Sequence, residues 1–460
     1  MLRRTQRRRQ RAGALIGQGV YGCGFFPGIR CSGEESHSND SKVFSKLMEL
    51  EDAEAEFEIN ALIRKIDPHE KYSIYPYKMC NIESKDYEKL KKEGIRSCEL
   101  IPSTITNSHV INNINKGNLK ILQSSYGGPT LFSIINRYNY MILNKIYISR
   151  TQKLIDFMYV LNAFENLFDG LVHYHNHDFA HLDIKDDNIV ISSDAKTNKC
   201  KFIDFGLSND VTKFDRDFVS IPIHSPADLL ILIHWTKIFN SDNTINIPHD
   251  LIKTQANNIT EGMVIPFEVC GASYDENLNV VHNMPLMDEI YINILSALYT
   301  YNNFNAKTVR DEVKWLLLTG IDVYGLGFTL ARILYFMMDI KMYYGELYET
   351  DNKVIKESDV VLPLSIIHRL YTLVKNMTNL NPFQRYSAEE AQEVYSGIMT
   401  SLRSEQAQRR GRGMIKHVNK SKTRKSIKKL EKTLLSKNKE IALEPYLSSD
   451  VYYPKGVTKK

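Results

Sequence analysis

The chain has 460 residues, of which 43% are hydrophobic and 25% are charged, an ordinary composition for a soluble globular protein. This length exceeds what one small core needs and suits two lobes with extensions. The net charge of +5 is unevenly distributed, because residues 1–12 carry six Arg and no acid, residues 401–440 carry about +11, and residues 13–400 carry about −13.

The chain begins with a basic arm, residues 1–12, that is predicted to be disordered. A glycine-rich stretch, Gly17-Gln18-Gly19-Val20-Tyr21-Gly22, follows the apolar residues Ala14-Leu15-Ile16. Glycines let backbone amides approach phosphate groups closely, because no side chain is in the way. No helical pattern follows at once, which argues against a dinucleotide-binding fold. Taken alone the motif is a weak signal, since any tight turn could carry it.

A strand and a helix are predicted next. Val43-Phe44-Ser45-Lys46-Leu47 has the composition of a strand. The pattern from Glu49 to Ile66 is helical, with one apolar stripe formed by Ala55, Ile59, Leu62 and Ile66. This helix is expected to end before Asp67-Pro68, because the residue before a proline disfavours the helical conformation.

Residues 69–118 are rich in Asn, Lys and Ser and read as irregular. A strand, 119–123, is predicted after them and runs into Tyr126-Gly127-Gly128-Pro129. From Leu154 to Val172 apolar residues keep helical spacing, which predicts a core helix. His173, His175 and His177 alternate at its end without a cysteine or acid at ligand spacing, so a metal site is not expected there.

The strongest signal is the stretch His181-Leu182-Asp183-Ile184-Lys185-Asp186-Asp187-Asn188, followed after a strand pattern by Asp204-Phe205-Gly206. An acid, a cation two residues on, an amide and a second acid at a strand end suit phosphoryl transfer from a nucleotide. Asp183 would accept or orient the proton of the substrate hydroxyl. Lys185 would neutralise charge on the moving phosphoryl group. Asn188 and Asp204 would hold magnesium.

This stretch resembles the H-R-D-x-K-x-x-N loop of eukaryotic-type protein kinases, and Asp204-Phe205-Gly206 resembles their metal-binding D-F-G. Tyr21-Gly22-Cys23 with Pro27 and Cys31 downstream, and the ending Lys65-Ile66-Asp67-Pro68, are similar to the divergent kinases of nucleocytoplasmic large DNA viruses (iridovirus- or mimivirus-like). The resemblance covers most of residues 13–402. It implies an α+β, bilobal protein-kinase-like fold with a strand-rich N-lobe and a helical C-lobe.

The resemblance also implies a domain organisation. The kinase domain would cover 13–402, with the N-lobe at 13–123, the hinge at 124–128 and the C-lobe at 129–402, between the basic arm 1–12 and a basic tail 403–460. Asp322-Val323-Tyr324-Gly325-Leu326-Gly327 resembles the D-V-W-S-x-G start of the central C-lobe helix, where Asp322 would brace the catalytic-loop backbone. A large insertion, about 232–312, precedes this helix and is expected to pack on the C-lobe.

ATP and Mg²⁺ are the cofactors that the resemblance implies. Lys46 corresponds to the strand lysine that contacts the phosphates, with Lys42 as the alternative. A helix glutamate would pair with it, and Glu58 is slightly preferred over Glu56 for its distance to Pro68. The implied ATP-binding residues are Ile16, Gly17, Gln18, Gly19, Val20, Tyr21, Gly22, Lys46, Glu58, Glu56, Gln123 and Ser125.

Two positions depart from the family pattern near the adenine. The family has Val where this chain has Gly24, and a small residue where this chain has Phe44. Phe25 or Phe26 is therefore expected to cover the adenine in place of the missing valine.

The segment after Asp204 carries further departures. Ser225-Pro226-Ala227-Asp228 resembles an altered A-P-E motif, in which Asp228 would pair with Arg385. Position 182 is Leu where most of the family has the Arg that binds activation-loop phosphate. We therefore expect activity without phosphorylation of Ser208, Thr212 or Ser220, although Lys213 or Arg216 could replace the missing Arg.

The predicted function is ATP- and Mg-dependent phosphorylation of Ser or Thr hydroxyls in proteins, because Lys185 two residues after the catalytic acid is the Ser/Thr arrangement. The acidic folded part points weakly to basic substrates. Two alternatives remain open at this point: a pseudokinase scaffold, and a nucleic-acid-associated protein acting through its basic ends, where weak anionic contact is expected. A kinase of small molecules is a disfavoured variant.

The six cysteines are scattered without a C-x-x-C pair. This spacing argues against a zinc site and against a disulfide framework. It predicts an intracellular, reducing compartment: host cytoplasm, nucleus or virion if the protein is viral. The absence of an apolar segment after the N-terminal arginines argues against a secretory signal. The apolar run Tyr324 to Met338 is too short to span a bilayer and contains Arg332, so it is predicted to be a buried helix.

Overall fold

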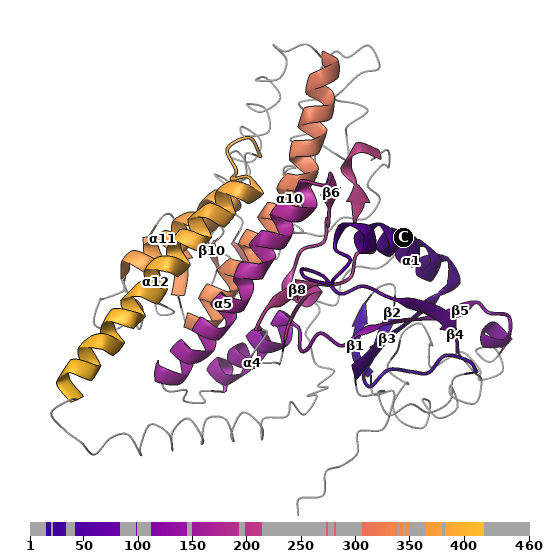
Figure 1. Cartoon of the computed structure of the whole chain (residues 1–460), viewed down its shortest axis with the longest axis horizontal. Coiled ribbons are helices and arrows are strands. Elements are labelled where there is room, and N and C mark those ends of the chain that lie inside the picture. Colours follow the sequence, from indigo (N-terminus) through magenta and orange to yellow (C-terminus); the bar gives the residue numbers. More distant parts are fainter. Residues whose placement is uncertain are drawn as a thin grey trace, which may run out of the picture. The chain divides into compact units, whose positions relative to one another are not determined.

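The structure of the chain is a computed structural model, drawn in Figure 1. The residues described are 15–19, 22–33, 42–82, 98, 112–144, 150–192, 198–213, 273–274, 280–281, 306–338, 340–343, 346–349, 362, 364–379 and 382–417. Two compact units are present: the first comprises Met1–Ala53, Lys78–Ser124 and Leu402–Lys460, and the second comprises Glu54–Tyr77 and Ser125–Ser401. The strand-rich sheet of the first unit and the helices of the second fit the predicted kinase-like fold.

The first unit is built on a five-stranded sheet in the order β1-β2-β3-β5-β4. Its strands are β1 Leu15–Gly19, β2 Gly22–Phe25, β3 Val43–Glu49, β4 Lys78–Asn81 and β5 Leu119–Ser125. β1, β2 and β3 pair antiparallel in sequence, as do β4 and β5. The glycine-rich stretch therefore forms the β1–β2 hairpin beside the strand that carries Lys46.

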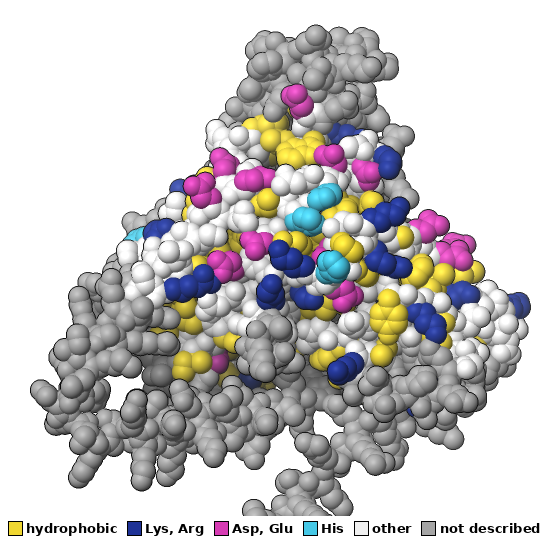
Figure 2. Space-filling view, viewed as in Figure 1, with side chains coloured by type: hydrophobic (Ala, Val, Ile, Leu, Met, Phe, Trp, Pro, Cys, Tyr) yellow, Lys and Arg dark blue, Asp and Glu magenta, His cyan; other side chains and the backbone are white. Residues whose placement is uncertain are grey.

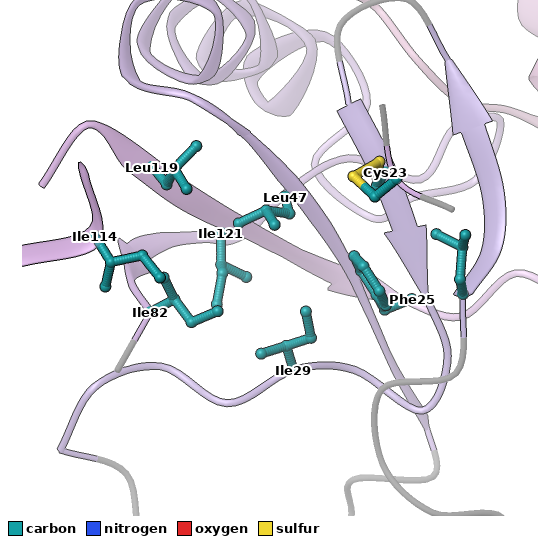
Figure 3. Packing of buried hydrophobic residues seen from close by; sticks show 10 residues of the cluster. Cys23, Phe25, Ile29, Leu47, Ile82, Ile114, Leu119 and Ile121 are labelled. Atoms are coloured by element: carbon teal, nitrogen blue, oxygen red, sulfur yellow. A yellow bond between two sulfur atoms is a disulfide. The ribbon is translucent and has the colours of Figure 1, made fainter. Parts of the chain in front are cut away.

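A hydrophobic core lies on one face of this sheet (Figure 3). β3 places Ser45 and Leu47 on that face, where both are fully buried, and successive side chains alternate between faces. The core residues are Leu15, Cys23, Phe25, Ile29, Leu47, Ile82, Cys98, Ile114, Leu119 and Ile121. Period-two alternation thus sends Phe44 and Lys46 to the opposite face.

Two disulfides cross-link the first unit, and the prediction of no disulfide framework is wrong. Cys23 bonds to Cys98 and Cys31 bonds to Cys80, at sequence separations of 75 and 49 residues. The sequence spacing gave no hint of these pairs because the sheet, rather than the local chain, brings the partners together. The expectation of a reducing compartment depended on unpaired cysteines, and the two bridges remove that support.

Reduction of these bridges is expected to destabilise the first unit. Each bridge closes a long loop and so restricts the unfolded chain, which is worth about 2–4 kcal/mol per bridge. Denaturant unfolding with and without dithiothreitol measures the difference. The control is a variant with all four bridging cysteines replaced by Ser, which should not respond to dithiothreitol. Equal unfolding midpoints for oxidised and reduced wild type would contradict the expectation.

The second unit is mainly helical. Its helices are α1 Leu50–Ile66, α4 Leu131–Leu143, α5 Arg150–His175, α10 Ala306–Met338, α11 Leu364–Met377 and α12 Ala388–His417, of which the first and the last extend past the unit boundary. Short antiparallel pairs join β6 Phe179–Ala180 to β9 Asn209–Asp210, β7 Ile189–Ile191 to β8 Cys200–Phe202, β10 Ser273–Tyr274 to β11 Val280–Val281, and β12 Ile340–Tyr343 to β13 Glu346–Glu349. Two helical turns, η3 Asp186–Asn188 and η4 Val211–Lys213, complete the described elements. The core helix predicted from Leu154 to Val172 is thereby confirmed as part of α5.

The central helix α10 is longer than expected. It begins at Ala306, inside the segment expected to be the insertion, so Asp322 lies in its middle and not at its start. The segment Glu312–Met338 is long and apolar enough to cross a membrane by length and composition, but 83% of its most apolar window is buried within the protein. A buried core helix has these same properties, and that is how we interpret α10.

Helix α1, Leu50–Ile66, ends where Asp67-Pro68 predicted, but its buried face differs from the predicted stripe. The buried residues are Ala53, Glu56, Asn60, Ile63 and Ile66, while Ala55 is exposed and Ile59 only partly buried. Two of the five are polar, so apolar periodicity alone selected the wrong face. The buried face is the one that brings a carboxylate toward the site described below.

The chain after α1 is fixed by the carboxylate of Asp67. Its Oδ2 accepts hydrogen bonds from the backbone of Tyr72 (2.9 Å) and Ser73 (3.0 Å), and its Oδ1 from the backbone of Lys71 (2.8 Å). The segment held in this way pairs with β8, because Phe202 bonds to the backbone of residues 72 and 74. The C-terminal end of α1 is therefore tied to the strand that leads into Asp204.

Candidate active site

A carboxylate of α10 holds the backbone of the loop that leads into Asp183. Asp322 accepts a hydrogen bond from the backbone nitrogen of His181 at Oδ2 (2.7 Å) and from that of Leu182 at Oδ1 (2.7 Å). The carboxylate is fully buried and also lies 3.3 Å from Nε2 of His175. Leu182 has a positive φ of 63°, which is uncommon for a non-glycine residue. Asp322 braces this backbone conformation, as predicted.

Asp183, Lys185 and Asn188 form one hydrogen-bonded cluster. Lys185 Nζ lies 2.8 Å from Asp183 Oδ2 and 3.1 Å from Oδ1. Asn188 Nδ2 donates to the same Oδ2 at 2.7 Å and to the backbone oxygen of Asp183 at 2.9 Å. The turn η3 folds the chain back so that residues two and five positions after Asp183 meet its carboxylate. Asp183 is held in one orientation by two donors from its own loop.

In this cluster, burial and the neighbouring opposite charge shift each pKa in opposite directions. Burial raises the pKa of the Asp183 carboxyl, while the Lys185 ammonium acts to lower it. Burial acts to lower the pKa of Lys185, but Asp183, together with the carboxylates of Asp204 and Asp187, acts in the opposite direction, and the pKa is raised. Each charge favours the ionised form of the other, which suits a group that must accept or orient a proton.

Replacing Lys185 with Met should move the acidic limb of the pH profile of kcat/KM to higher pH. The lysine is the largest influence that lowers the pKa of Asp183, so its removal leaves burial unopposed, and Asp183 protonates at a higher pH. Peptide phosphorylation measured from about pH 5 to 8 for both proteins tests this. Lys213→Met, at an exposed lysine paired with Asp210, is the control. An unmoved limb, or one moved to lower pH, would contradict the assignment.

Asp204 follows β8 and begins a turn with a positive φ of 62°. The next residue, Phe205, is buried against aromatic rings, with centroids 4.7 Å from His181 and 6.2 Å from Tyr174. A ring anchored in the core on one side leaves the exposed Asp204 at the surface of the site. Glu56 reaches this turn from α1, because its Oε2 lies 3.8 Å from where a Cβ on Gly206 would be.

The choice between Glu56 and Glu58 is thereby altered. Glu56 is buried beside the D-F-G turn, whereas Glu58 is exposed, so the structure favours Glu56 over the slightly preferred Glu58. Lys46 belongs to the first unit and Glu56 to the second. The pairing of a strand lysine with the helix glutamate therefore stays a prediction.

Asn188 and Asp204 fit a divalent cation by the chemistry of their oxygens. The amide nitrogen of Asn188 is engaged with Asp183, which leaves its amide oxygen as the atom for a cation. Mg²⁺ prefers oxygen ligands, takes few of them from protein and keeps several waters. Within the described residues no group of three or more His, Cys, Asp or Glu side chains could hold a metal, so a closed protein cage is absent there. When bound, Mg²⁺ would neutralise charge on the nucleotide phosphates.

The first unit carries the glycine-rich hairpin and the strand lysine. Lys46 lies in β3 opposite Gly24 of β2, and its Cε is 3.0 Å from where a Cβ on Gly22 would be. Lys42 precedes the strand and is exposed. This geometry agrees with Lys46 as the lysine beside the glycine-rich stretch. Gly17 of that stretch has no atom within 4 Å of an ideal Cβ, so space rather than contact surrounds it.

The remaining predicted ATP-binding residues are divided. Gln123 is buried, and its Nε2 donates a hydrogen bond to the backbone oxygen of Ile29 (2.9 Å). Its side chain is therefore engaged inside the first unit. Ser125 is exposed just past the unit boundary, and Ile16 is one of the exposed large apolar residues. The side chains of Gln18, Gly19, Val20 and Tyr21 lie outside the part of the chain that the structure describes.

The activation segment is described as far as Lys213. Ser208 is buried and its Oγ donates to the backbone oxygen of His181 at 3.0 Å, so this hydroxyl is no accessible phosphorylation site in this conformation. Thr212 is exposed, and Lys213 pairs with Asp210 at 2.9 Å. The predicted roles of Arg216, Ser220 and Asp228 fall outside the described residues.

Arg385 is held by groups that the sequence did not indicate. Its guanidinium donates to the backbone oxygens of Asn379 and Gly320 at 2.9–3.0 Å and lies over the ring of Tyr324, 5.1 Å from the centroid. These contacts anchor the buried arginine to α10.

Arg332, which interrupts the apolar run of α10, has a role that the sequence did not indicate. Its Nε lies 3.2 Å from Oδ2 of the buried Asp186, inside the η3 turn between Asp183 and Asn188. Burial raises the pKa of Asp186, and Arg332 acts to lower it. The only available signal was a charge in a segment otherwise suited to burial, since buried charges are usually paired.

The chain was compared with families and with curated proteins, and one family model matches it. No curated protein matches the chain. The family model named protein kinase domain matches residues 79–222, a segment that contains the whole cluster around Asp183 and the turn at Asp204. Over this segment the chain is therefore protein-kinase-like.

Proposed function

We propose that the protein is an ATP- and Mg-dependent protein kinase that phosphorylates Ser and Thr hydroxyls. The observation that carries the proposal is the cluster in which Asp183 Oδ2 receives both Lys185 Nζ and Asn188 Nδ2. A carboxylate fixed in this way can accept or orient the hydroxyl proton. The ammonium beside it can neutralise charge on the moving phosphoryl group without moving itself.

Several steps of phosphoryl transfer then fall to residues of this chain. Asp183 orients the attacking hydroxyl, Lys185 stabilises charge on the transferred group, and Asn188 and Asp204 provide the oxygens for magnesium. Lys46 and the glycine-rich hairpin bind the nucleotide phosphates. Lys185 two residues after Asp183 supports Ser/Thr over Tyr specificity.

A labelled-ATP assay on purified protein tests the proposal. Peptides that differ only in a central Ser, Thr or Tyr, in a basic and in an acidic version, should show transfer to Ser and Thr that requires Mg²⁺. Transfer to Tyr alone would overturn the specificity. No transfer to any peptide or to the protein itself, with ATP bound, would indicate a scaffold.

The enzyme should be active as made, without activation-loop phosphate. Leu182 has no charge to pair with a phosphate, and Ser208 is buried, which leaves Thr212 as the accessible hydroxyl among the described candidates. Phosphatase-treated protein should therefore phosphorylate peptide linearly from the first time point, and Thr212→Ala should change the rate less than about twofold. A lag that disappears after preincubation with ATP would contradict this.

Protein substrates with basic character are part of the proposal, since residues 13–400 are acidic on average. On the face in Figure 2, Lys and Arg side chains are interspersed with Asp and Glu, so the described surface there offers no single-sign field for nucleic acid. Origin from a large DNA virus is likewise proposed, on Tyr21-Gly22-Cys23 and on Lys65-Ile66-Asp67-Pro68.

A further inference from the structure

The face of the first unit's sheet that carries Lys46 has two glycines on one strand and two large side chains on the next. On β2, Cys23 and Phe25 face the core, so Gly22 and Gly24 lie on the opposite face. On β3 the same face carries Phe44 and Lys46. Small residues on one strand therefore lie beside large ones on its neighbour.

The contact between Gly24 and Phe44 is close. A Cβ built on Gly24 would lie 2.8 Å from Cζ and 2.9 Å from Cε2 of Phe44, closer than side chains tolerate. The ring of Phe44 thus occupies the space that any side chain at position 24 would need. The glycine and the phenylalanine are complementary, and each explains the other.

Lys46 has the same relation to the adjacent glycine. Its Cε lies 3.0 Å from where a Cβ on Gly22 would be, so the lysine runs under the start of β2. The Cα atoms of residues two positions apart on a strand are about 6.6 Å apart. Phe44 and Lys46 therefore place a ring and an ammonium at successive positions on one face of β3, an arrangement that suits a ligand with a flat base at one end and phosphates at the other.

Neither Phe25 nor Phe26 suits the role of covering the base as well as Phe44 does. Phe25 is fully buried in the core on the other face (Figure 3). Phe26 lies past the end of β2. Phe44 is only partly buried and leans over Gly24 toward the glycine-rich hairpin.

We infer that Phe44 is the surface on which the adenine of ATP stacks, an inference that rests on the proposed nucleotide binding. An aromatic ring beside a bare backbone presents a flat apolar face, and such faces stack well on nucleobases. The absence of a side chain at Gly24 leaves the space that this ring occupies. The departures at positions 24 and 44 are then one exchange of size between neighbouring strands, and not a shift of register.

The experiment measures binding of ATP and of inorganic triphosphate to wild type, Phe44→Ala, Phe44→Leu, Gly24→Val and the double variant Phe44→Ala/Gly24→Val. Phe44→Ala should weaken ATP binding about tenfold, within the range for loss of one base–aromatic stack. Phe44→Leu keeps the bulk without the flat face and should lose about threefold. Binding of triphosphate, which has no base, should be unchanged in both, and a purely structural role would not separate the two ligands.

The reciprocal exchange gives a second, independent readout. Gly24→Val alone should weaken ATP binding, because its side chain displaces the ring. Phe44→Ala/Gly24→Val moves the bulk to the other strand and should bind ATP more tightly than either single variant. Phe26→Ala is the matched control, with ATP affinity close to wild type. Melting temperatures identify any variant that loses affinity by unfolding, in which case Phe44→Leu decides.

The outcomes separate this inference from the function on which it rests. Wild type that binds ATP while Phe44→Ala and Phe44→Leu bind it equally well would overturn the inference and leave the kinase assignment standing. A larger loss in Phe26→Ala than in Phe44→Ala, or equal losses for ATP and triphosphate, would also overturn it. Wild type that binds no ATP would overturn the proposed function and this inference together.

Discussion

Asp183→Asn is expected to lower kcat about 10³-fold while leaving the protein folded, because general-base and orienting groups contribute on this scale. The amide has nearly the shape of the carboxylate but cannot accept the hydroxyl proton, and it presents no charge to Lys185. Steady-state phosphorylation of a Ser peptide measures the loss. ATP affinity should change little, since the role proposed for Asp183 is toward the hydroxyl rather than the nucleotide.

Asp204→Asn should reduce turnover on a similar scale for a different reason. It removes a negative oxygen from the proposed metal site, so part of its loss should recover at raised Mg²⁺, which Asp183→Asn should not show. Asp187→Asn, at an exposed acid of the same loop, is the matched control and should stay within about threefold of wild type. Near wild-type turnover of Asp183→Asn or Asp204→Asn would show that the assigned role is wrong.

Lys46→Met should lower kcat/KM about 10²-fold, whereas Lys42→Met should change it less than about twofold. Lys46 lies within β3 beside Gly22, where its ammonium can reach phosphates held by the glycine-rich hairpin. Lys42 is exposed before the strand begins. Methionine keeps the length and apolar stem of lysine, so the difference isolates the charge. Kinetics with varied ATP measures it.

The reverse ranking of the two lysine variants would move the register of the whole first unit by four residues. It would also remove the basis for placing Phe44 over the nucleotide, since the two residues share a face through the same alternation. Thermal unfolding of both variants provides the control, because neither lysine belongs to the hydrophobic core.

Much of the site could be predicted from the sequence, because it depends on local spacing. Asp183, Lys185 and Asn188 lie within six consecutive residues, so the chain near them suffices to bring them together. Asp322 was recognisable from its motif and braces the loop backbone as expected. The strands around Lys46 and Leu119 and the helix ending before Pro68 also followed from local pattern.

Other features required the folded chain, because they join residues that are distant in sequence. The buried face of α1 includes Glu56 and Asn60, which apolar periodicity excludes, and only packing shows that a carboxylate lies there beside the D-F-G turn. The disulfides join cysteines 49 and 75 residues apart, a distance at which spacing carries no information.

The pair Gly24 and Phe44 shows most clearly the difference between what local sequence determines and what the folded sheet decides. In the sequence they are two separate departures from a family pattern, twenty positions apart. In the sheet they are neighbours that fill one space. Local propensity determined that both strands form, whereas strand pairing decided which side chains share a face and can compensate for one another.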